Sequence, residues 1–429
     1  MTPSEITRPE IAKFGNDEYA FSDFYSKYRI KCEKIGTAEK PIYLKLDLQL
    51  NKEWKGLQDI SFKLSKPELS IKECDDGFWE ISGTPLKEGV IELEIKYNIL
   101  SESKQLLNVS RQFPLAQVSV SPRSLWKDLK TDPKGEYFCN DTDNIDIAAN
   151  EKFEKNIMAA SRRGRSHAHK GTFRDDNFKC TVLDSGWAIM AVSDGAGSAE
   201  FSRKGSLIAC EAFVNKAKEL LEHEKLREQF SINNENQTTI EETAKKIMWN
   251  AAYECYRKVY DEATSKNRSI KKYAATLLAV ITKKIGNAWF GATVFVGDGI
   301  IGLLAKDGKI QLLSEPDGGE QVGETRFISM PEIWGNSDEE SRKKFIESRT
   351  RTFWTNDFDC LMAMTDGVSD PIFGTDSGLK EEATWSKLRK EIFEALESSP
   401  EKNNSEKLLD WLNFYIESHH DDRTIAILH

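Results

Sequence analysis

Hydrophobic and polar residues alternate along much of the first part of the chain. The run over 42–50 places a hydrophobic residue at every second position, and similar runs follow at 60–64 and 90–97. A period of two puts one face of a strand against a core and the other face in water. Turn sequences such as 83–85 separate the runs, so we expect a small antiparallel β-sandwich over residues 36–120.

The pattern changes after residue 152 into a mixture of strands and helices. Hydrophobic residues spaced three to four positions apart predict helices over 202–221, 238–266, 385–396 and 408–416. Apolar runs that end in turn sequences lie before and between these helices, and they predict strands. The second part of the chain is therefore expected to be a mixed α/β domain.

Two polar segments complete the expected organisation. Residues 1–35 are polar apart from one aromatic cluster and predict an N-terminal extension. Residues 121–152 contain two prolines and many polar residues, which is typical of a linker. The mixed domain is then expected over 153–429, and a fragment that begins near residue 150 is expected to contain all of it.

Composition and charge exclude several classes of protein. The 429 residues carry 60 Lys and Arg against 70 Asp and Glu, a formal net charge of −10, which argues against general affinity for nucleic acid or an anionic membrane. Seven scattered Cys and six His form no CxxC or HExxH pattern, so a zinc finger or zincin is not expected. The polar N-terminus is not a signal peptide, and no apolar run approaches the roughly 18 residues of a membrane span. We therefore expect a cytoplasmic protein.

Several aspartates of the mixed domain lie where an apolar strand meets a turn. A carboxylate at such a strand end stands on a rigid element, and several that converge make an oxygen-rich site that suits magnesium or manganese rather than zinc. A hairpin turn is the simpler explanation for any single Asp-Gly pair. The sequences after Asp194 and Asp366 do not return as hairpin strands, which favours the metal site. The aspartates are Asp175, Asp176, Asp194, Asp298, Asp366 and Asp421.

Six motifs occur in order between residue 164 and the C-terminus: GRSHAHKGTFRDDNF, AVSDGAGSAEFSRKGS, AATLLAV, VGDG, MTDGVSD and DDRTIAIL. Together they resemble the metal-dependent protein phosphatase 2C family, especially its bacterial branch. The resemblance implies a catalytic α/β/β/α two-sheet sandwich, so the expected fold class is α+β with a small all-β sandwich before the catalytic domain. It also implies hydrolysis of phosphoserine or phosphothreonine by a water bridged between two divalent ions, Mn²⁺ or Mg²⁺.

The resemblance also implies roles for individual residues. The residues that match the ligands of the two metals are Asp176, Asp194, Asp366 and Asp421, together with the backbone carbonyl of Gly195. Asp194 would bridge both metals, and Asp298 and Asp370 match acidic residues beside a weaker third ion. The four aspartates are also the expected catalytic residues, because no Ser, Cys or His nucleophile is required.

This sequence departs from the family pattern at three positions. Asp175 replaces a glutamate, Ala196 replaces the histidine that serves as general acid in the eukaryotic branch, and Gly171 replaces the arginine that binds phosphate. The segment 161–179 carries six Lys or Arg against two Asp and offers replacements for that arginine, although a solvated surface charge is the alternative for each. The candidates are Arg165, His167, Lys170 and Arg174.

The leading hypothesis is a serine/threonine protein phosphatase, with phosphorylated proteins from a serine/threonine kinase system as its implied substrates. The alternative is a catalytically silent phosphatase-like module that binds or senses a phosphoprotein. The complete set of aspartates favours activity, whereas the missing arginine and histidine favour the silent module. Residues 78–97 are similar to the strand–Gly-Thr-Pro–strand signature of immunoglobulin-like modules, which implies protein contacts for the β domain. Neither nucleic acid nor a membrane is an expected partner.

Overall fold

The computed structural model describes residues 126–230, 237–316, 325–336, 338–375, 377–397 and 401–429, and, before them, residues 65–68 and the strands named below. The chain divides into two compact units, Met1–Trp126 and Lys127–His429.

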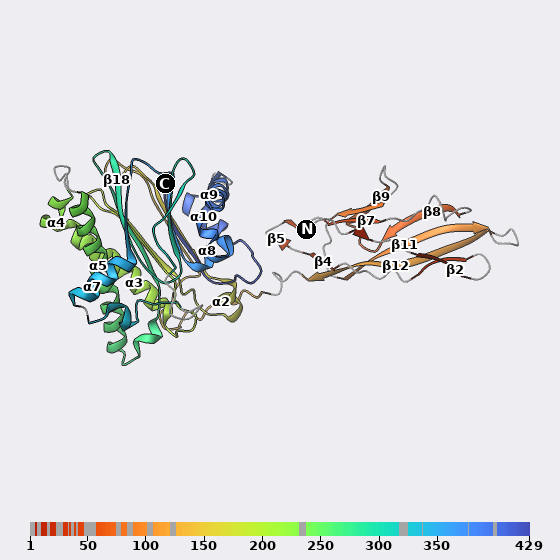
Figure 1. The fold of residues 1–429 in the computed structure, drawn as a ribbon. Coiled ribbons are helices and arrows are strands. Elements are labelled where there is room, and N and C mark those ends of the chain that lie inside the picture. The colour runs from red at the N-terminus through yellow and green to blue at the C-terminus, as the bar shows by residue number, and fades with distance from the viewer. Residues whose placement is uncertain are drawn as a thin grey trace. The chain divides into compact units, whose positions relative to one another are not determined.

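The first unit is built from strands in the part of it that the structure describes (Figure 1). One four-stranded sheet has the order β1 (Glu5–Ile6), β7 (Ile42–Leu46), β10 (Trp79–Gly83) and β9 (Leu69–Glu73). The other has the order β4 (Arg29–Cys32), β12 (Leu106–Val120), β11 (Gly89–Leu100) and β8 (Leu57–Leu64). Two short pairs complete the unit: β2 (Glu10–Phe14) with β3 (Glu18–Ser22), and β5 (Lys34–Ile35) with β6 (Ala38–Glu39).

Strand β11 confirms the alternation expected from its sequence. Ile91, Leu93, Ile95 and Tyr97 are buried, and the residues between them are exposed or half-buried. The segment 1–35 differs from the expected extension, because β1 pairs with β7 and β4 pairs with β12. The all-β character of the unit agrees with the expectation, and its likeness to immunoglobulin modules remains a prediction.

Two antiparallel sheets face each other in the second unit. The five-stranded sheet has the order β15 (Asn177–Val182), β16 (Ala188–Ser193), β17 (Leu277–Ile285), β18 (Ala288–Val296) and β21 (Thr350–Thr355). The six-stranded sheet has the order β13 (Thr142–Ile147), β14 (Ile157–Arg162), β23 (Arg423–Leu428), β22 (Cys360–Met364), β19 (Ile300–Leu304) and β20 (Ile310–Leu312).

Helices cover the outer faces of both sheets (Figure 1). Beside the five-stranded sheet lie α3 (Ser202–Glu222), α4 (Glu224–Gln229), α5 (Gln237–Ser265), α6 (Pro331–Trp334) and α7 (Glu339–Arg349). Beside the six-stranded sheet lie α8 (Asp366–Phe373), α9 (Glu382–Glu397) and α10 (Asn404–Trp411). The short α2 (Arg165–Lys170) follows β14.

Three hydrophobic clusters separate the four layers. On β16, Ile189 packs beneath α3 and α5, while its neighbour Met190 points between the sheets. On β23, Ala426 lies between the sheets, while Ile427 packs with Trp385 beneath α9. Both faces of these strands are therefore buried, which explains their continuous apolar sequences. The expected α/β/β/α sandwich is confirmed.

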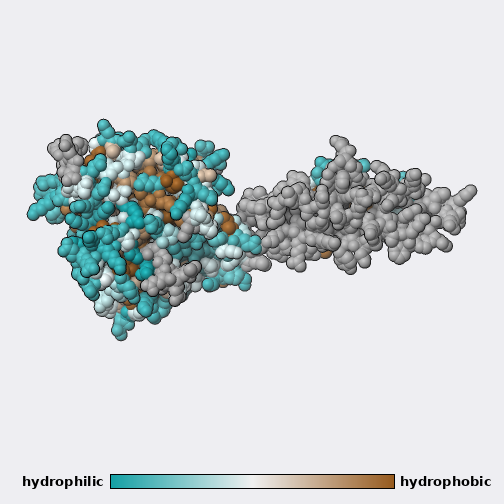
Figure 2. Space-filling model, viewed as in Figure 1, coloured by the Kyte–Doolittle hydropathy of each residue, from teal (hydrophilic) through white to brown (hydrophobic). Residues whose placement is uncertain are grey.

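The surface of the second unit follows from this layering. Its visible face is mainly hydrophilic, with hydrophobic side chains showing in the region of the two sheets near the C-terminus (Figure 2). No helix in the described parts of the chain has both the length and the apolar character that crossing a membrane requires.

Three of the four predicted helices agree closely with α3, α5 and α9, and the fourth is displaced. Helix α10 spans Asn404–Trp411 rather than 408–416. Asn403 determines this start, because its side chain accepts a hydrogen bond from the backbone amide of Glu406 at 2.9 Å. The Glu406 carboxylate accepts one from the Asn403 amide at 3.0 Å, which completes a capping box.

The expected linker 121–152 contains a strand of the six-stranded sheet. Strand β13 pairs with β14 along its whole length, and Asn144 and Asp146 bind Ser405 at 2.7 and 2.9 Å. The second unit therefore begins at Lys127 rather than at residue 153. The sequence TDNIDI did not predict this strand because an edge strand with few apolar residues resembles a loop in composition.

Truncation at the two boundaries is expected to give different results. A fragment of residues 127–429 should fold, whereas a fragment of residues 153–429 should have a melting temperature lower by at least about 5 °C. The shorter fragment loses the pairing of β13 with β14 and both bonds to Ser405. Thermal unfolding of the two fragments measures the difference, and equal melting temperatures would show that β13 is dispensable.

Candidate metal centre

Strand ends from both sheets bring the predicted aspartates together. Asp194 directly follows β16, and Asp298 lies two residues beyond β18. Asp366 is the first residue of α8, two residues beyond β22. Carboxylate oxygens of these three residues lie within 4.8 Å of one another. Three short connections thus place three negative charges within reach of one ion.

Asp176 is fully buried, and only one of its carboxylate oxygens is bound. Its Oδ2 accepts hydrogen bonds from Thr365 Oγ1 at 2.8 Å and Thr424 Oγ1 at 2.7 Å. Its Oδ1 has no hydrogen-bond partner among the described residues, and the same is true of the buried Oδ1 of Asp298. Asp298 Oδ2 accepts from Thr325 at 2.5 Å. Burying a carboxylate oxygen without a donor is costly, so these two oxygens fit a bound cation.

The loop that carries Asp194 and Gly195 is fixed on both sides. The Asp194 amide donates to Thr276 Oγ1, and the Thr276 amide donates to the Asp194 carbonyl, both at 2.8 Å. Gly195 continues this contact through a β-bridge with Ala275. A Cβ atom on Gly195 would lie 2.6 Å from the carbonyl oxygen of Asp175, so only glycine fits.

The clustered carboxylates raise one another's pKa. Burial and the charge of Asp422 raise the pKa of Asp176 to about 7. Burial and the charge of Asp366 raise the pKa of Asp194 well above its usual value, and burial with the charge of Asp298 does the same to Asp366. Each group therefore favours its protonated form unless a cation offsets the repulsion.

His167 and Asp421 lie beside this group. His167 Nε2 is 3.7 Å from Asp421 Oδ1, and its Nδ1 pairs with Thr172 Oγ1 at 3.0 Å. Burial lowers the pKa of His167, but the charges of nearby aspartates, chiefly Asp422 and Asp175, outweigh it and raise that pKa above its usual value. His167 thus lies beside Asp421, and the charge of Asp421 helps to raise the pKa of Asp194.

Asp422 holds the loops around the centre through hydrogen bonds, a role that the sequence did not predict. It is buried, and its carboxylate accepts hydrogen bonds from three backbone amides, those of Gly164 at 2.6 Å, Asp175 at 2.5 Å and Asp176 at 3.3 Å. It therefore joins the end of β23 to two loops of distant sequence. Its place beside Asp421 was the only signal in the sequence.

Asp175 and Asp370 lie at the edge of the centre. The Asp175 carboxylate is 4.0 Å from Arg203 Nη1, and burial raises its pKa to about 6. Asp370 is exposed one helical turn beyond Asp366 on α8. Of the two residues expected beside a third ion, Asp298 belongs to the central group, and Asp370 lies near enough for its charge to help raise the pKa of Asp366.

The basic candidates occupy different places. Arg165 donates to the carbonyl oxygens of Phe414 at 3.0 Å and Asn413 at 2.9 Å, so it holds the C-terminal loop. Lys170 is exposed at the end of α2. Arg174 is only 3% exposed, and within the described structure its Nε and Nη1 have no hydrogen-bond partner. Two buried guanidinium nitrogens without an acceptor fit an anion such as phosphate.

Comparisons with known proteins identify a family that this chain matches. A family model described as protein phosphatase 2C matches residues 163–413, more than half of the chain. No curated protein matches the chain.

Solved structures similar to the chain include the following three. RsbX in complex with magnesium is 16% identical with a TM-score of 0.35, and the match covers 67% of this chain and 98% of that one. The catalytic domain of the serine/threonine protein phosphatase PstP with two manganese ions is 14% identical with a TM-score of 0.36, covering 63% and 96%. Stp1 from Staphylococcus aureus is 12% identical with a TM-score of 0.36, covering 70% and 96%.

The metal-free protein is expected to lose stability as the pH rises. Asp175 and Asp176 have pKa values of about 6 and about 7 in the folded state, above the usual 3.8, so the folded state binds more protons than the unfolded state between these values. Unfolding free energy therefore falls by a few kcal/mol from about pH 4 to about pH 7. Asp176→Asn should reduce this slope in melting experiments with a chelator. An identical slope in the variant would contradict the assignment of Asp176.

Proposed function

The chain belongs to the protein phosphatase 2C family, and from this premise we propose that its second unit removes phosphate from phosphoserine and phosphothreonine in proteins. The observation that supports the proposal is the convergence of Asp194, Asp298 and Asp366 beside the unbound buried oxygen of Asp176. Oxygen ligands of this kind suit Mn²⁺ or Mg²⁺, the ions of the family.

The chain's own residues have separate tasks in this proposal. Asp194 interacts with Asp366 and with Asp176, so its carboxylate is suited to face two ions at once. Asp421 completes the ligand set, and the Gly195 carbonyl belongs to the loop fixed by Thr276. When bound, the two ions supply an activated water and stabilise the charge of the transferring phosphoryl group.

Arg174 is the residue that we assign to the substrate phosphate. Of the four basic candidates, Arg165 is bound to the C-terminal loop and Lys170 lies in solvent, whereas Arg174 has unbound buried donors. His167 lies close enough to the centre to assist it. The silent binding module is not favoured, because the retained aspartates converge as a metal site requires. Kinase-generated phosphoproteins as substrates and protein contacts for the first unit remain predictions.

Turnover should depend on Mn²⁺ or Mg²⁺ and on Asp194. Hydrolysis of p-nitrophenyl phosphate and phosphopeptides should require either ion and stop with a chelator. Asp194→Asn should lower kcat by at least about 100-fold, since even outer-shell partners of a metal contribute up to that factor. Asp184→Asn is the matched control, because Asp184 is an exposed aspartate paired with Lys152 on the surface. Turnover that survives the chelator, or near-native activity of Asp194→Asn, would overturn the proposal.

Arg174→Gln should weaken phosphate recognition without changing metal binding. The loss of a charged hydrogen bond worth about 1.5–3 kcal/mol should raise KM for phosphopeptides and the inhibition constant of inorganic phosphate by roughly 10-fold or more. Stability should stay the same or rise, since the variant removes buried donors that have no partner in the described structure. Lys170→Gln is the control from the same basic segment. Unchanged phosphate inhibition together with a lower melting temperature would show that Arg174 is structural.

A further inference from the structure

Residues 127–141, which we call the strap, join the first unit to β13 and lie outside the residues 163–413 that match the family model. The strap contains turns but neither helix nor strand. Its contacts with the rest of the second unit are made by side chains and by single backbone bonds. These contacts fall into two groups, one that joins both ends of the strap to Arg163 and one around Tyr137 between the ends.

The first group holds α2, the helix that carries His167. The side chain of Arg163 is only 4% exposed and binds Asp128 at 2.9 Å and Asp141 at 3.2 Å, so both ends of the strap meet on one residue. The Leu129 amide donates to the carbonyl of Ala168 at 2.9 Å. The residue after Arg163 is Gly164, whose amide binds Asp422. The strap is thus attached to a segment that borders the metal centre.

Tyr137 is the centre of the second group. Its hydroxyl donates to Glu262 Oε1 at 2.7 Å and lies 3.2 Å from the hydroxyl of Tyr273. Its ring meets the ring of Phe201 edge-on, with centroids 5.6 Å apart. Arg203 donates to the Tyr137 carbonyl at 3.0 Å. These contacts hold Tyr137 at a φ of 55°, a left-handed conformation that is uncommon for a tyrosine and persists only where the surroundings enforce it.

A continuous series of contacts leads from Tyr137 to the metal-binding loop. Tyr273 is fully buried and belongs to the segment 272–276, which runs beside the segment 194–201. The bonds between the two segments are Phe201 amide to Lys272 carbonyl at 2.8 Å, Ala196 amide to Ala274 carbonyl at 3.0 Å, and the bridge of Gly195 with Ala275. The position of Tyr273 therefore bears directly on the position of Asp194 and Gly195.

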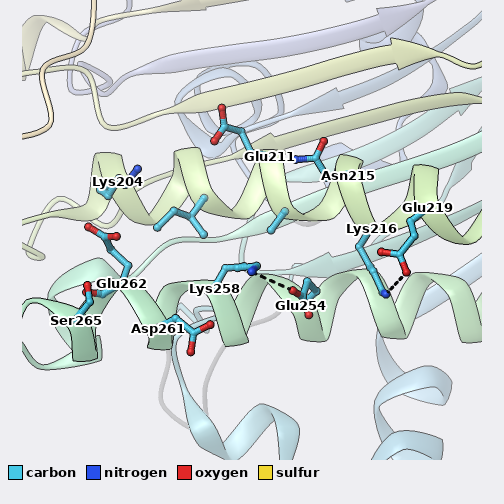
Figure 3. A pocket seen from close by; sticks show the side chains of 12 residues that line it. Lys204, Glu211, Asn215, Lys216, Glu219, Glu254, Lys258, Asp261, Glu262 and Ser265 are labelled. Carbon is cyan, nitrogen blue, oxygen red and sulfur yellow. Dashed lines mark hydrogen bonds and ion pairs between the residues drawn. The ribbon is translucent and has the colours of Figure 1, made fainter.

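The partner of Tyr137 on α5 is accessible from outside. Glu262 lines a groove of about 650 Å³ between α3 and α5, together with Lys204, whose Nζ is 5.7 Å from the Tyr137 ring centre. Figure 3 shows Glu262 and Lys204 toward one end of this groove and Glu219 and Lys216 toward the other. The groove also offers a control position, Glu211 on α3, which lines it nearer the middle.

We infer that the strap positions the metal centre, with Tyr137 as its positioning residue. By fixing Tyr273 and Phe201, Tyr137 keeps the loop of Asp194 and Gly195 in the geometry that accepts the ions. The inference rests on the metal centre proposed above. It gives a role to the strap, which contains none of the residues that match the family's metal ligands.

Manganese binding to the full chain tests this inference by titration calorimetry. Tyr137→Ala should weaken Mn²⁺ binding by roughly 10-fold, the range typical of residues that orient metal ligands, and should lower kcat for p-nitrophenyl phosphate with little change in KM. Tyr137→Phe keeps the ring and loses the hydroxyl bonds, so its effect should be smaller. Tyr260→Ala, at an exposed tyrosine of α5, should leave both quantities unchanged.

Variants of Glu262 keep the test independent of any folding defect in Tyr137→Ala. Glu262→Gln retains an acceptor oxygen and should be near native, whereas Glu262→Ala should resemble Tyr137→Phe and Glu211→Ala should have no effect. Native Mn²⁺ affinity in both Tyr137→Phe and Glu262→Ala, with only the melting temperature lowered, would overturn the inference and leave the strap as packing. Failure of the unaltered protein to bind Mn²⁺ would instead overturn the proposed function, so the two failures are distinguishable.

Discussion

Crowding of buried negative charge is the constraint on which this structure depends. Asp176, Asp194 and Asp366 lie where the ends of two sheets converge, and burial and mutual repulsion raise the pKa of each. Side chains in such an arrangement separate unless rigid elements hold them. The four-layer core supplies that rigidity, because Asp194 and Asp366 follow strands that are buried along their whole length, and Thr365 and Thr424 hold Asp176. A divalent cation then converts the repulsion into a common attraction.

Neutral hydrogen-bond donors around the centre stabilise the crowded carboxylates. Thr365 and Thr424 stabilise one oxygen of Asp176, and three backbone amides stabilise Asp422. None of these donors brings a positive charge that would compete with an ion. Basic side chains lie at the border of the centre, where His167 is 3.7 Å from Asp421 and Arg203 is 4.0 Å from Asp175. The centre therefore keeps its negative potential while every loop around it stays fixed.

The sequence predicted the aspartates because each lies at a recognisable strand end within a motif. It did not predict the role of Asp422, whose hydrogen bonds join residues about 250 positions apart and leave no local pattern. Local composition also misplaced the start of the second unit, since the strap and β13 are as polar as a linker. Arg165 shows a further limit of prediction from sequence. The positive charge of its segment was evident, but its hydrogen bonds to the carbonyl oxygens of Asn413 and Phe414 form only in the folded chain.

The residues proposed to bind the metals and the residue inferred to position them lie in different parts of the sequence. The aspartates up to Asp370 lie in the family-matched residues, whereas Tyr137 lies before them and holds an unfavourable backbone conformation against two aromatic rings. Strain of this kind persists only where several contacts over-determine it. Because the strap begins where the first unit ends, the covalent connection between the units leads directly into the residues that fix the metal-binding loop. A freely flexible linker would not make these contacts, so residues 127–141 are polar like a linker but, as we infer, help to position the metal centre.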